Sequence, residues 1–148
     1  VMSSSQSTAE IAATRLATAG TFEVAVVAPG LEDAPSQPQL FTVKNPVPVI
    51  TGLSPDAVPM GAPAFALTVE GTGFVEGAAI LWDGIERPTT FVNATQLQAA
   101  VGATDLVPAR TIGIRVRNPS PGGGGSNTEM FAIQAPGGLR VFLPLIAK

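Results

Sequence analysis

Short apolar runs alternate with glycine and proline between residues 48 and 84, where the chain reads PVITGLSPDAVPMGAPAFALTVEGTGFVEGAAILWDG. In residues 65–70, Phe, Leu and Val alternate with Ala, Thr and Glu, which is the period-two pattern of a half-buried strand. Residues 79–82 form a further apolar run, and the Asp83-Gly84 pair that follows is a strong hairpin signal. The pattern therefore predicts strands joined by tight turns.

The same alternation continues to residue 134 and predicts seven strands. They span approximately residues 47–53, 64–70, 78–82, 86–92, 95–102, 110–117 and 128–134. Seven short strands in one unit are typical of an all-β fold, an antiparallel β-sandwich of the immunoglobulin type. The residues expected to fill its core are Ile50, Phe65, Leu67, Val69, Leu81, Trp82, Leu97, Val101, Ile112, Ile114, Val116 and Phe131. Residues 106–109 are expected to cross between the sheets, with a short helical turn possible there.

The chain also resembles itself at a fixed spacing. A shift of 90 residues aligns residues 3–46 with residues 93–136 without a gap, giving twelve identities in 44 positions. Most apolar positions keep their character, which chance similarity rarely does. The alignment predicts that residues 46–134 are one complete repeat and that residues 1–45 are the C-terminal half of a preceding one, supplying its last three strands.

Two connecting segments carry further predictions. Asn45-Pro46 is the junction between the repeats and is expected to be a short, proline-stiffened linker. The run from Pro121 to Ser126 is rich in glycine but lacks the lysine and helix of a phosphate-binding loop, so a flexible hairpin loop is expected. The aligned positions Leu31-Glu32-Asp33-Ala34 lack these glycines, so the first loop should differ.

A set of turn glycines, prolines and core residues carries a family resemblance. Its members are Pro48, Ile50, Leu53, Ser54, Pro55, Gly61, Gly71, Gly73, Phe74, Trp82, Gly84, Asn118, Pro119, Gly124 through Asn127, and Phe131. In this pattern residues 46–134 resemble an IPT/TIG domain, the immunoglobulin-like fold shared by plexins, transcription factors and many bacterial surface proteins. The resemblance implies an E-set type sandwich, tandem repeats of about 90 residues, and a bacterial secreted or cell-surface protein.

Composition narrows the chemistry. The chain has 148 residues, a net charge of −3, and only 13% charged residues, against about 25% in an average protein. It contains no cysteine and no histidine, which excludes disulfides, thiolate metal sites and the commonest general base. No enzyme activity, cofactor or metal is expected. Nucleic acid is an unfavourable partner at this charge, and no apolar run approaches the roughly 20 residues of a membrane span.

The last segment, residues 135–148, is predicted to be a glycine-hinged apolar tail. Gly137-Gly138 supplies the hinge, and the residues after it are β-prone and apolar on both faces. The candidate assembly residues are Leu139, Val141, Phe142, Leu143, Leu145 and Ile146. One hypothesis is that this tail is donated as a β-strand to the half-built repeat of another copy. The alternatives are that it folds back on residues 46–134 or serves as an export signal.

These features favour a structural or adhesive extracellular protein, a subunit of a surface fibre, sheath or layer. Its partners would be other copies of itself or other surface proteins. The alternative is a non-catalytic carbohydrate- or protein-binding module appended to a larger secreted enzyme, which would imply glycan contact. A DNA-binding domain of the transcription-factor type is disfavoured by the charge.

Overall fold

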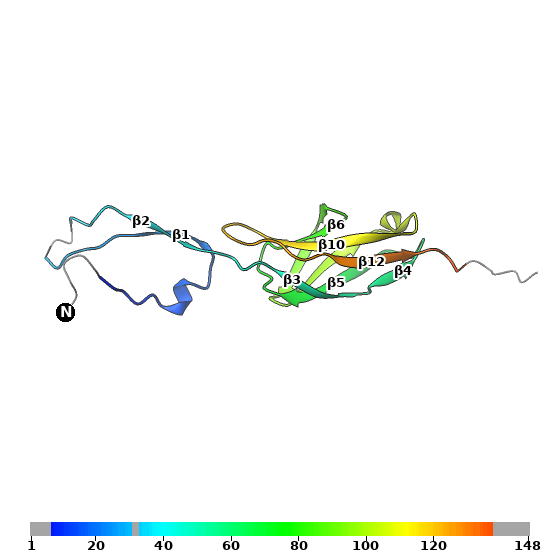
Figure 1. Ribbon diagram of the computed structural model, residues 1–148, viewed down its shortest axis with the longest axis horizontal. Coiled ribbons are helices and arrows are strands. Elements are labelled where there is room, and N and C mark those ends of the chain that lie inside the picture. Colours follow the sequence, from blue (N-terminus) through cyan, green and yellow to red (C-terminus); the bar gives the residue numbers. More distant parts are fainter. Residues whose placement is uncertain (1–6, 31–32, 138–148) are drawn as a thin grey trace, which may run out of the picture.

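The computed structural model describes residues 7–30 and 33–137, which form two regions joined end to end (Figure 1). The first region, here called the two-stranded unit, lies within residues 7–45. It contains the 3-10 helix η1 (Ala13–Arg15) and the antiparallel strands β1 (Gly20–Val24) and β2 (Gln39–Val43). The second region, here called the sandwich, covers residues 46–134. A single chain segment connects the two (Figure 1).

The sandwich consists of two facing sheets. Its elements are β3 (Val49–Ser54), β4 (Ala57–Pro59), β5 (Phe65–Thr72), β6 (Ala79–Trp82), β7 (Ile85–Arg87), β8 (Thr89–Asn93), β9 (Gln96–Val101), η2 (Ala103–Leu106), β10 (Arg110–Asn118), β11 (Gly124–Gly125) and β12 (Glu129–Gln134). One sheet has the order β4-β12-β10-β6-β7, with β11 paired to β10. The other sheet has the order β3-β5-β9-β8. The predicted all-β, immunoglobulin-like sandwich is therefore confirmed.

The core lies between the two sheets, and most of the residues predicted to fill it are buried. Phe131 stacks on the half-buried Phe65 with ring centroids 5.9 Å apart and lies 5.0 Å from the ring of Trp82. Leu81 is a wrong prediction, because adjacent residues of a strand point to opposite faces and Trp82 already points inward. Ile80 fills the core in its place and is completely buried.

Two strand predictions were wrong in detail. The expected strand at residues 86–92 is two strands, β7 and β8, which belong to different sheets and meet at Pro88. Proline has no N–H to give to a ladder, so the chain can leave one sheet there and enter the other. The sandwich is also not purely antiparallel, because β4 pairs with β12 in parallel.

The predicted turn and crossover are confirmed. Asp83 and Gly84 both have positive φ, 53° and 81°, as a two-residue hairpin between β6 and β7 requires. The chain crosses from the β9 sheet to the β10 sheet between Val101 and Arg110, but the helical turn, η2, begins three residues before the expected segment 106–109. Leu106 at its end is completely buried. The hairpin and this crossover place the charged side chains discussed below at one end of the sandwich.

The two-stranded unit repeats the pairing of β10 with β12 residue for residue. Gly20 lies opposite Val43, and Arg110 lies opposite Ile133, so both partners are displaced by the same 90 residues. The remaining pairs of the two ladders follow the same offset. Residues 7–11, which align with part of β9, form no strand, so only two of the three expected strands occur among the described residues. Strand β9 lies between β5 and β8, and the two-stranded unit has no described counterpart of either.

Two further observations concern the whole chain. Within residues 7–30 and 33–137, no helix has the length and hydropathy needed to cross a membrane. The predicted tail strand at residues 139–146 lies outside the described residues.

Candidate functional site

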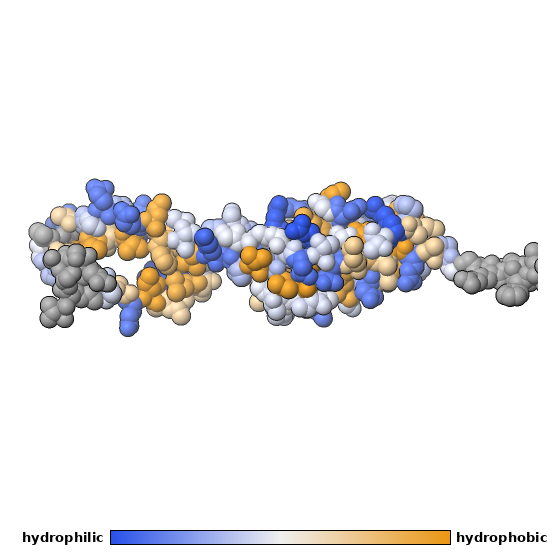
Figure 2. Space-filling model, in the orientation of Figure 1, coloured by the Kyte–Doolittle hydropathy of each residue, from blue (hydrophilic) through white to orange (hydrophobic). Residues whose placement is uncertain are grey.

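The two-stranded unit presents an uncovered apolar face. Phe22 and Phe41 lie opposite each other in the β1–β2 ladder and are 43% and 41% exposed. Their aligned residues in the sandwich, Ile112 and Phe131, are 1% and 0% exposed. The same contrast holds for four further pairs of aligned residues, which are Ile11 and Val101, Leu16 and Leu106, Val24 and Ile114, and Val26 and Val116. Figure 2 shows hydrophobic residues gathered on this unit.

A hollow of about 450 Å³ separates the segment around η1 from the β1–β2 sheet. Its apolar lining comes from both sides and consists of Ile11, Ala12, Leu16, Phe22, Val24, Phe41 and Val43. Three charged residues, Glu10, Arg15 and Glu23, also line it. In the sandwich, the corresponding face of β10 and β12 packs against the sheet that contains β3, β5 and β9. The hollow therefore lies where the two-stranded unit has no described second layer.

Local hydrogen bonds of the two regions also coincide at the 90-residue offset. Ser36 Oγ accepts a bond from the Val26 N–H at 2.9 Å, and the Ser36 N–H donates to the Val26 carbonyl at 2.9 Å. Ser126 and Val116 make the same two bonds at 2.9 and 2.8 Å. Each 3-10 helix also begins with the same backbone bond. The Arg15 N–H donates to the Ala12 carbonyl at 2.9 Å in η1, and the Asp105 N–H donates to the Gly102 carbonyl at 3.0 Å in η2.

The loop between β10 and β12 holds the junction between the two regions. The Asn45 N–H donates to the Pro121 carbonyl at 2.8 Å, and the Asn45 carbonyl accepts from the Gly123 N–H at 2.8 Å. The Asn45 side-chain amide donates to the Pro119 carbonyl at 2.9 Å. The connection is therefore fastened by three bonds to one residue, in addition to the stiffness of Pro46. We call this arrangement the junction clamp.

The glycine run is part of this clamp, so the expectation of a flexible loop is wrong. Gly122 has φ of 72°, and a Cβ there would lie 2.5 Å from the Cβ of Lys44. Only glycine fits such a close approach at positive φ without strain. On the other side of the clamp, the Asn118 side chain donates to the carbonyls of Pro46 at 2.9 Å and Gly73 at 2.6 Å.

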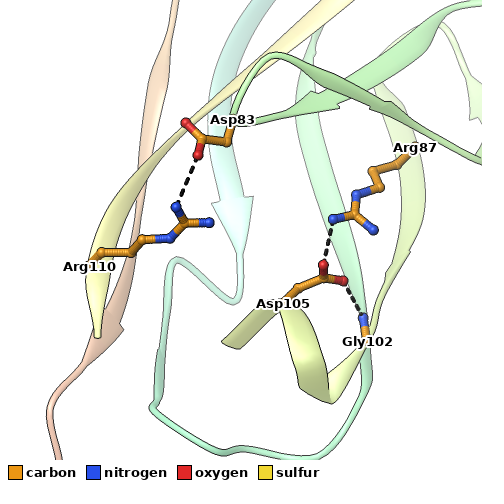
Figure 3. Close-up of polar contacts among 5 residues, drawn as sticks. All are labelled: Asp83, Arg87, Gly102, Asp105 and Arg110. Atoms are coloured by element: carbon orange, nitrogen blue, oxygen red, sulfur yellow. Dashed lines mark hydrogen bonds and ion pairs between the residues drawn. The ribbon is translucent and has the colours of Figure 1, made fainter. Parts of the chain in front are cut away.

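At the far end of the sandwich, charged side chains form separate ion pairs (Figure 3). Arg110 pairs with Asp83 of the β6–β7 hairpin at 3.2 Å, and Arg87 pairs with Asp105 of η2 at 2.6 Å. The hydrogen bond from Arg87 lowers the pKa of Asp105 below its usual value of 3.8, against an opposing effect of burial, and the Gly102 N–H helps at 3.0 Å. These pairs tie a turn and a crossover to neighbouring strands.

The two arginines farther along β10 also have partners. Arg117 pairs with Glu86 across the sheet, and Arg115 Nε donates to the Ser126 carbonyl at 3.3 Å. No group of three or more metal-ligating side chains occurs among residues 7–30 and 33–137. A polar hollow of about 320 Å³ beside Glu70 and Asn93 has no aromatic side chain in its lining. Trp82 is 2% exposed, which confirms its predicted place in the core and leaves it no face for stacking on a sugar.

A comparison with protein-family models matches the IPT/TIG domain to residues 48–133, more than half of the chain. The chain belongs to the IPT/TIG family. A search of curated proteins found no match to it. TIG domains are immunoglobulin-like, generally non-catalytic modules that occur in surface or binding proteins. The match covers the sandwich and not the two-stranded unit.

The structure thus brings together residues that the sequence had singled out for other reasons. Asn118, Pro119 and Gly124 carried the TIG resemblance, and they lie in or next to the loop that clamps Asn45. The clamp itself was missed, since it joins residues more than 70 positions apart. The candidate assembly residues, Leu139 to Ile146, lie beyond the described part of the chain.

Proposed function

We propose that this chain is a structural segment of a secreted or cell-surface protein in which TIG sandwiches follow one another as tandem repeats. One observation carries the proposal, which is that the β1–β2 ladder has the register of the β10–β12 ladder at an offset of 90 residues. An unrelated hairpin would share neither this register nor the serine bonds next to it. Residues 7–45 are accordingly the C-terminal half of a preceding TIG repeat.

The junction clamp supports a role in which the protein resists tension or sets a spacing. A flexible linker leaves neighbouring domains free to move, whereas a short segment fastened by several hydrogen bonds fixes their relative direction. Here the bonds to Asn45 and the Asn118 bond to Pro46 attach the end of one repeat to the beginning of the next. Repeats joined in this way form a stiff rod, which suits an extracellular fibre, sheath or adhesive layer.

Assembly through the tail belongs to the same proposal. The residues from Leu139 to Ile146 would be donated as a strand to an open sheet edge of another copy, because backbone hydrogen bonds and side-chain pockets together give such contacts affinity. Repetition of a head-to-tail contact that does not close produces a filament. Deleting residues 139–148 tests this step. A truncated protein that still assembles as the full chain does would show that strand donation is wrong.

Negative-stain imaging of native material tests the structural role. Filaments, sheets or regular arrays are expected, and a strictly monodisperse monomer with its tail intact would contradict the proposal. The alternative, a carbohydrate-binding module appended to an enzyme, predicts glycan affinity in the same material. The exclusion of Trp82 from the surface and the lack of aromatics beside Glu70 give that alternative no support.

The clamp has its own test. A Gly122→Ala side chain would collide with Lys44 at a positive φ, so we expect the loop to leave the linker and the two regions to move independently. Small-angle X-ray scattering should then show a broader distribution of maximum dimensions. The control is Gly84→Ala, which has φ of 81° but no neighbour within 4 Å, and it should leave the scattering curve unchanged. A Gly122→Ala curve identical to that of the parent would argue against a rigid junction.

A further inference from the structure

The apolar face of the two-stranded unit is the largest feature that the proposed function does not use. It carries the aromatic pair Phe22 and Phe41 and lines a hollow of about 450 Å³. The aligned inward residues of β10 and β12 are buried against the β3-β5-β9-β8 sheet, and they are Ile112, Ile114, Val116 and Phe131. The shape of the partner that fits this face can therefore be read from the sandwich itself.

We propose that this face binds a TIG-type half-sandwich, a sheet equivalent to β3-β5-β9-β8, carried on the same polypeptide ahead of η1. This inference rests on the proposed tandem repeats and names the partner of the incomplete one. A single donated strand, such as residues 139–146, would fill only one strand position of that sheet. The partner is thus a layer of several strands with aliphatic residues on alternate positions.

The volumes of the aligned residues that differ between the two regions support this fit. Phe22 is larger than its aligned residue Ile112, whereas Val24 is smaller than Ile114 and Val43 is smaller than Ile133. Cores accept such substitutions when the total volume and the pattern are kept. The face therefore suits a sheet with nearly the same apolar surface as the one formed by β3, β5 and β9.

The position of η1 favours a partner on the same polypeptide. In the sandwich, η2 carries the chain from β9 across to β10. The helix η1 is closed by the same backbone bond, occupies the aligned position, and borders the hollow through Ile11 and Leu16. A chain that enters η1 therefore comes from the side on which the second layer would lie. A sheet donated by another molecule would have no need of a crossover already in place.

The charge at the crossover adds a property of the partner. Asp105 of η2 pairs with Arg87, the last residue of β7, after which Pro88 takes the chain into β8 of the second sheet. The residue aligned with Asp105 is Arg15, and its side chain lines the hollow. An arginine at the position of Arg87 would face another arginine, at a cost in stability. The segment that leads into the partner layer should therefore carry an acidic residue there.

A fusion onto residues 6–148 tests both parts of the inference. A copy of residues 46–95 is joined directly to Gln6, which aligns with Gln96, and Arg87 of the copy is changed to Glu. Hydrogen exchange of the amides of β1 and β2 should slow on the order of 100-fold relative to residues 1–148, because the strands become part of a closed core. Binding of an apolar dye to the protein should fall at the same time.

Matched fusions make the result interpretable. Changing Leu67 and Val69 of the copy to Asp should abolish the protection, since these residues are completely buried in the sandwich. Leaving Arg87 of the copy unchanged should make exchange about two- to fivefold faster than in the Arg87→Glu fusion. Equal exchange in the fusions with Arg87 and with Arg87→Glu would overturn the prediction of an acidic residue.

Other outcomes overturn the partner itself. Unchanged exchange in the Arg87→Glu fusion, with the original sandwich still folded, would show that the face does not accept a TIG half-sandwich. Concentration-dependent protection of β1 and β2 in residues 1–148 would show that a second copy covers the face. Neither outcome depends on whether native material forms filaments, so failure of this inference is distinguishable from failure of the structural role.

Discussion

The β1–β2 hairpin and the β10–β12 hairpin of the sandwich share the same strand register but differ in how far their side chains are buried. In the sandwich, the inward side chains of the hairpin are buried by a second sheet, whereas Phe22, Val24 and Phe41 remain more than 40% exposed in the two-stranded unit. The ladder and the serine bonds beside it are nevertheless the same. Local hydrogen bonds and alternation thus suffice to set the register, while burial depends on a layer that comes from elsewhere in the sequence.

The largest expected difference between the two hairpins is at the aromatic pair Phe131 and Phe41. Phe131→Ala should lower the free energy of unfolding of the sandwich by about 3–5 kcal/mol, because it removes a completely buried ring beside Trp82. Phe41→Ala is the matched control and should change it by no more than about 0.5 kcal/mol. Urea unfolding followed by the fluorescence of Trp82, the single tryptophan, reports on the sandwich alone. Comparable losses in both variants would show that the two hairpins share one core.

A second pair isolates the effect of burial on a hydrogen bond. Ser126 is 5% exposed and Ser36 is exposed, although each accepts a bond from a backbone N–H at 2.9 Å. Ser126→Ala leaves the Val116 N–H unpaired in the interior and should cost about 1–3 kcal/mol. After Ser36→Ala the Val26 N–H can donate to water instead, so no measurable loss of stability is expected in the same urea experiment. A loss from Ser36→Ala as large as that from Ser126→Ala would mean that water does not reach the first hairpin.

The smallest expected effect concerns Asp105 and its aligned residue Arg15. The pKa of Asp105 is lowered in the folded state, so its contribution to stability is present above the usual value of 3.8 and is lost as the pH falls through the lowered value. Asp105→Asn should therefore cost about 1 kcal/mol at pH 7 and progressively less in acid. Thermal unfolding of both proteins between pH 7 and pH 2 measures this convergence. Arg15→Gln should show no such trend, and a Asp105→Asn difference that grows in acid would contradict the assigned pKa.

The fold was largely predictable because alternation and turn residues act over short distances. Residues 79–82 and the Asp83-Gly84 hairpin formed where the sequence placed them. The change of sheet at Pro88 was missed, because the alternation around it continues and only the three-dimensional pairing reveals the switch. The strand β11 consists of two glycines, which carry no strand signal at all.

The candidate site was less predictable, because it depends on contacts between distant segments. The glycine run correctly indicated a special loop, but nothing in residues 121–126 says that it fastens Asn45. The exposure of Phe22 and Phe41 likewise could not be read from their own hairpin, since the same pattern is buried in the sandwich. A short stretch of sequence does not show which distant segment packs against it. Both the junction clamp and the apolar face of the two-stranded unit depend on such a segment.

The ion pair between Arg87 and Asp105 bears on how the chain folds while it is being synthesised. Residues 46–101 leave the ribosome after the β1–β2 hairpin and, at about 5–20 residues per second, a few seconds before β10 and β12 are complete. Where the earlier half repeat does not yet cover it, the β1–β2 hairpin offers the new sheet the register and apolar pattern of its proper partner. Docking there would bring Arg87 against Arg15, whereas the later hairpin offers it Asp105. The reversal of charge at the crossover would therefore disfavour docking of the new sheet onto the earlier hairpin.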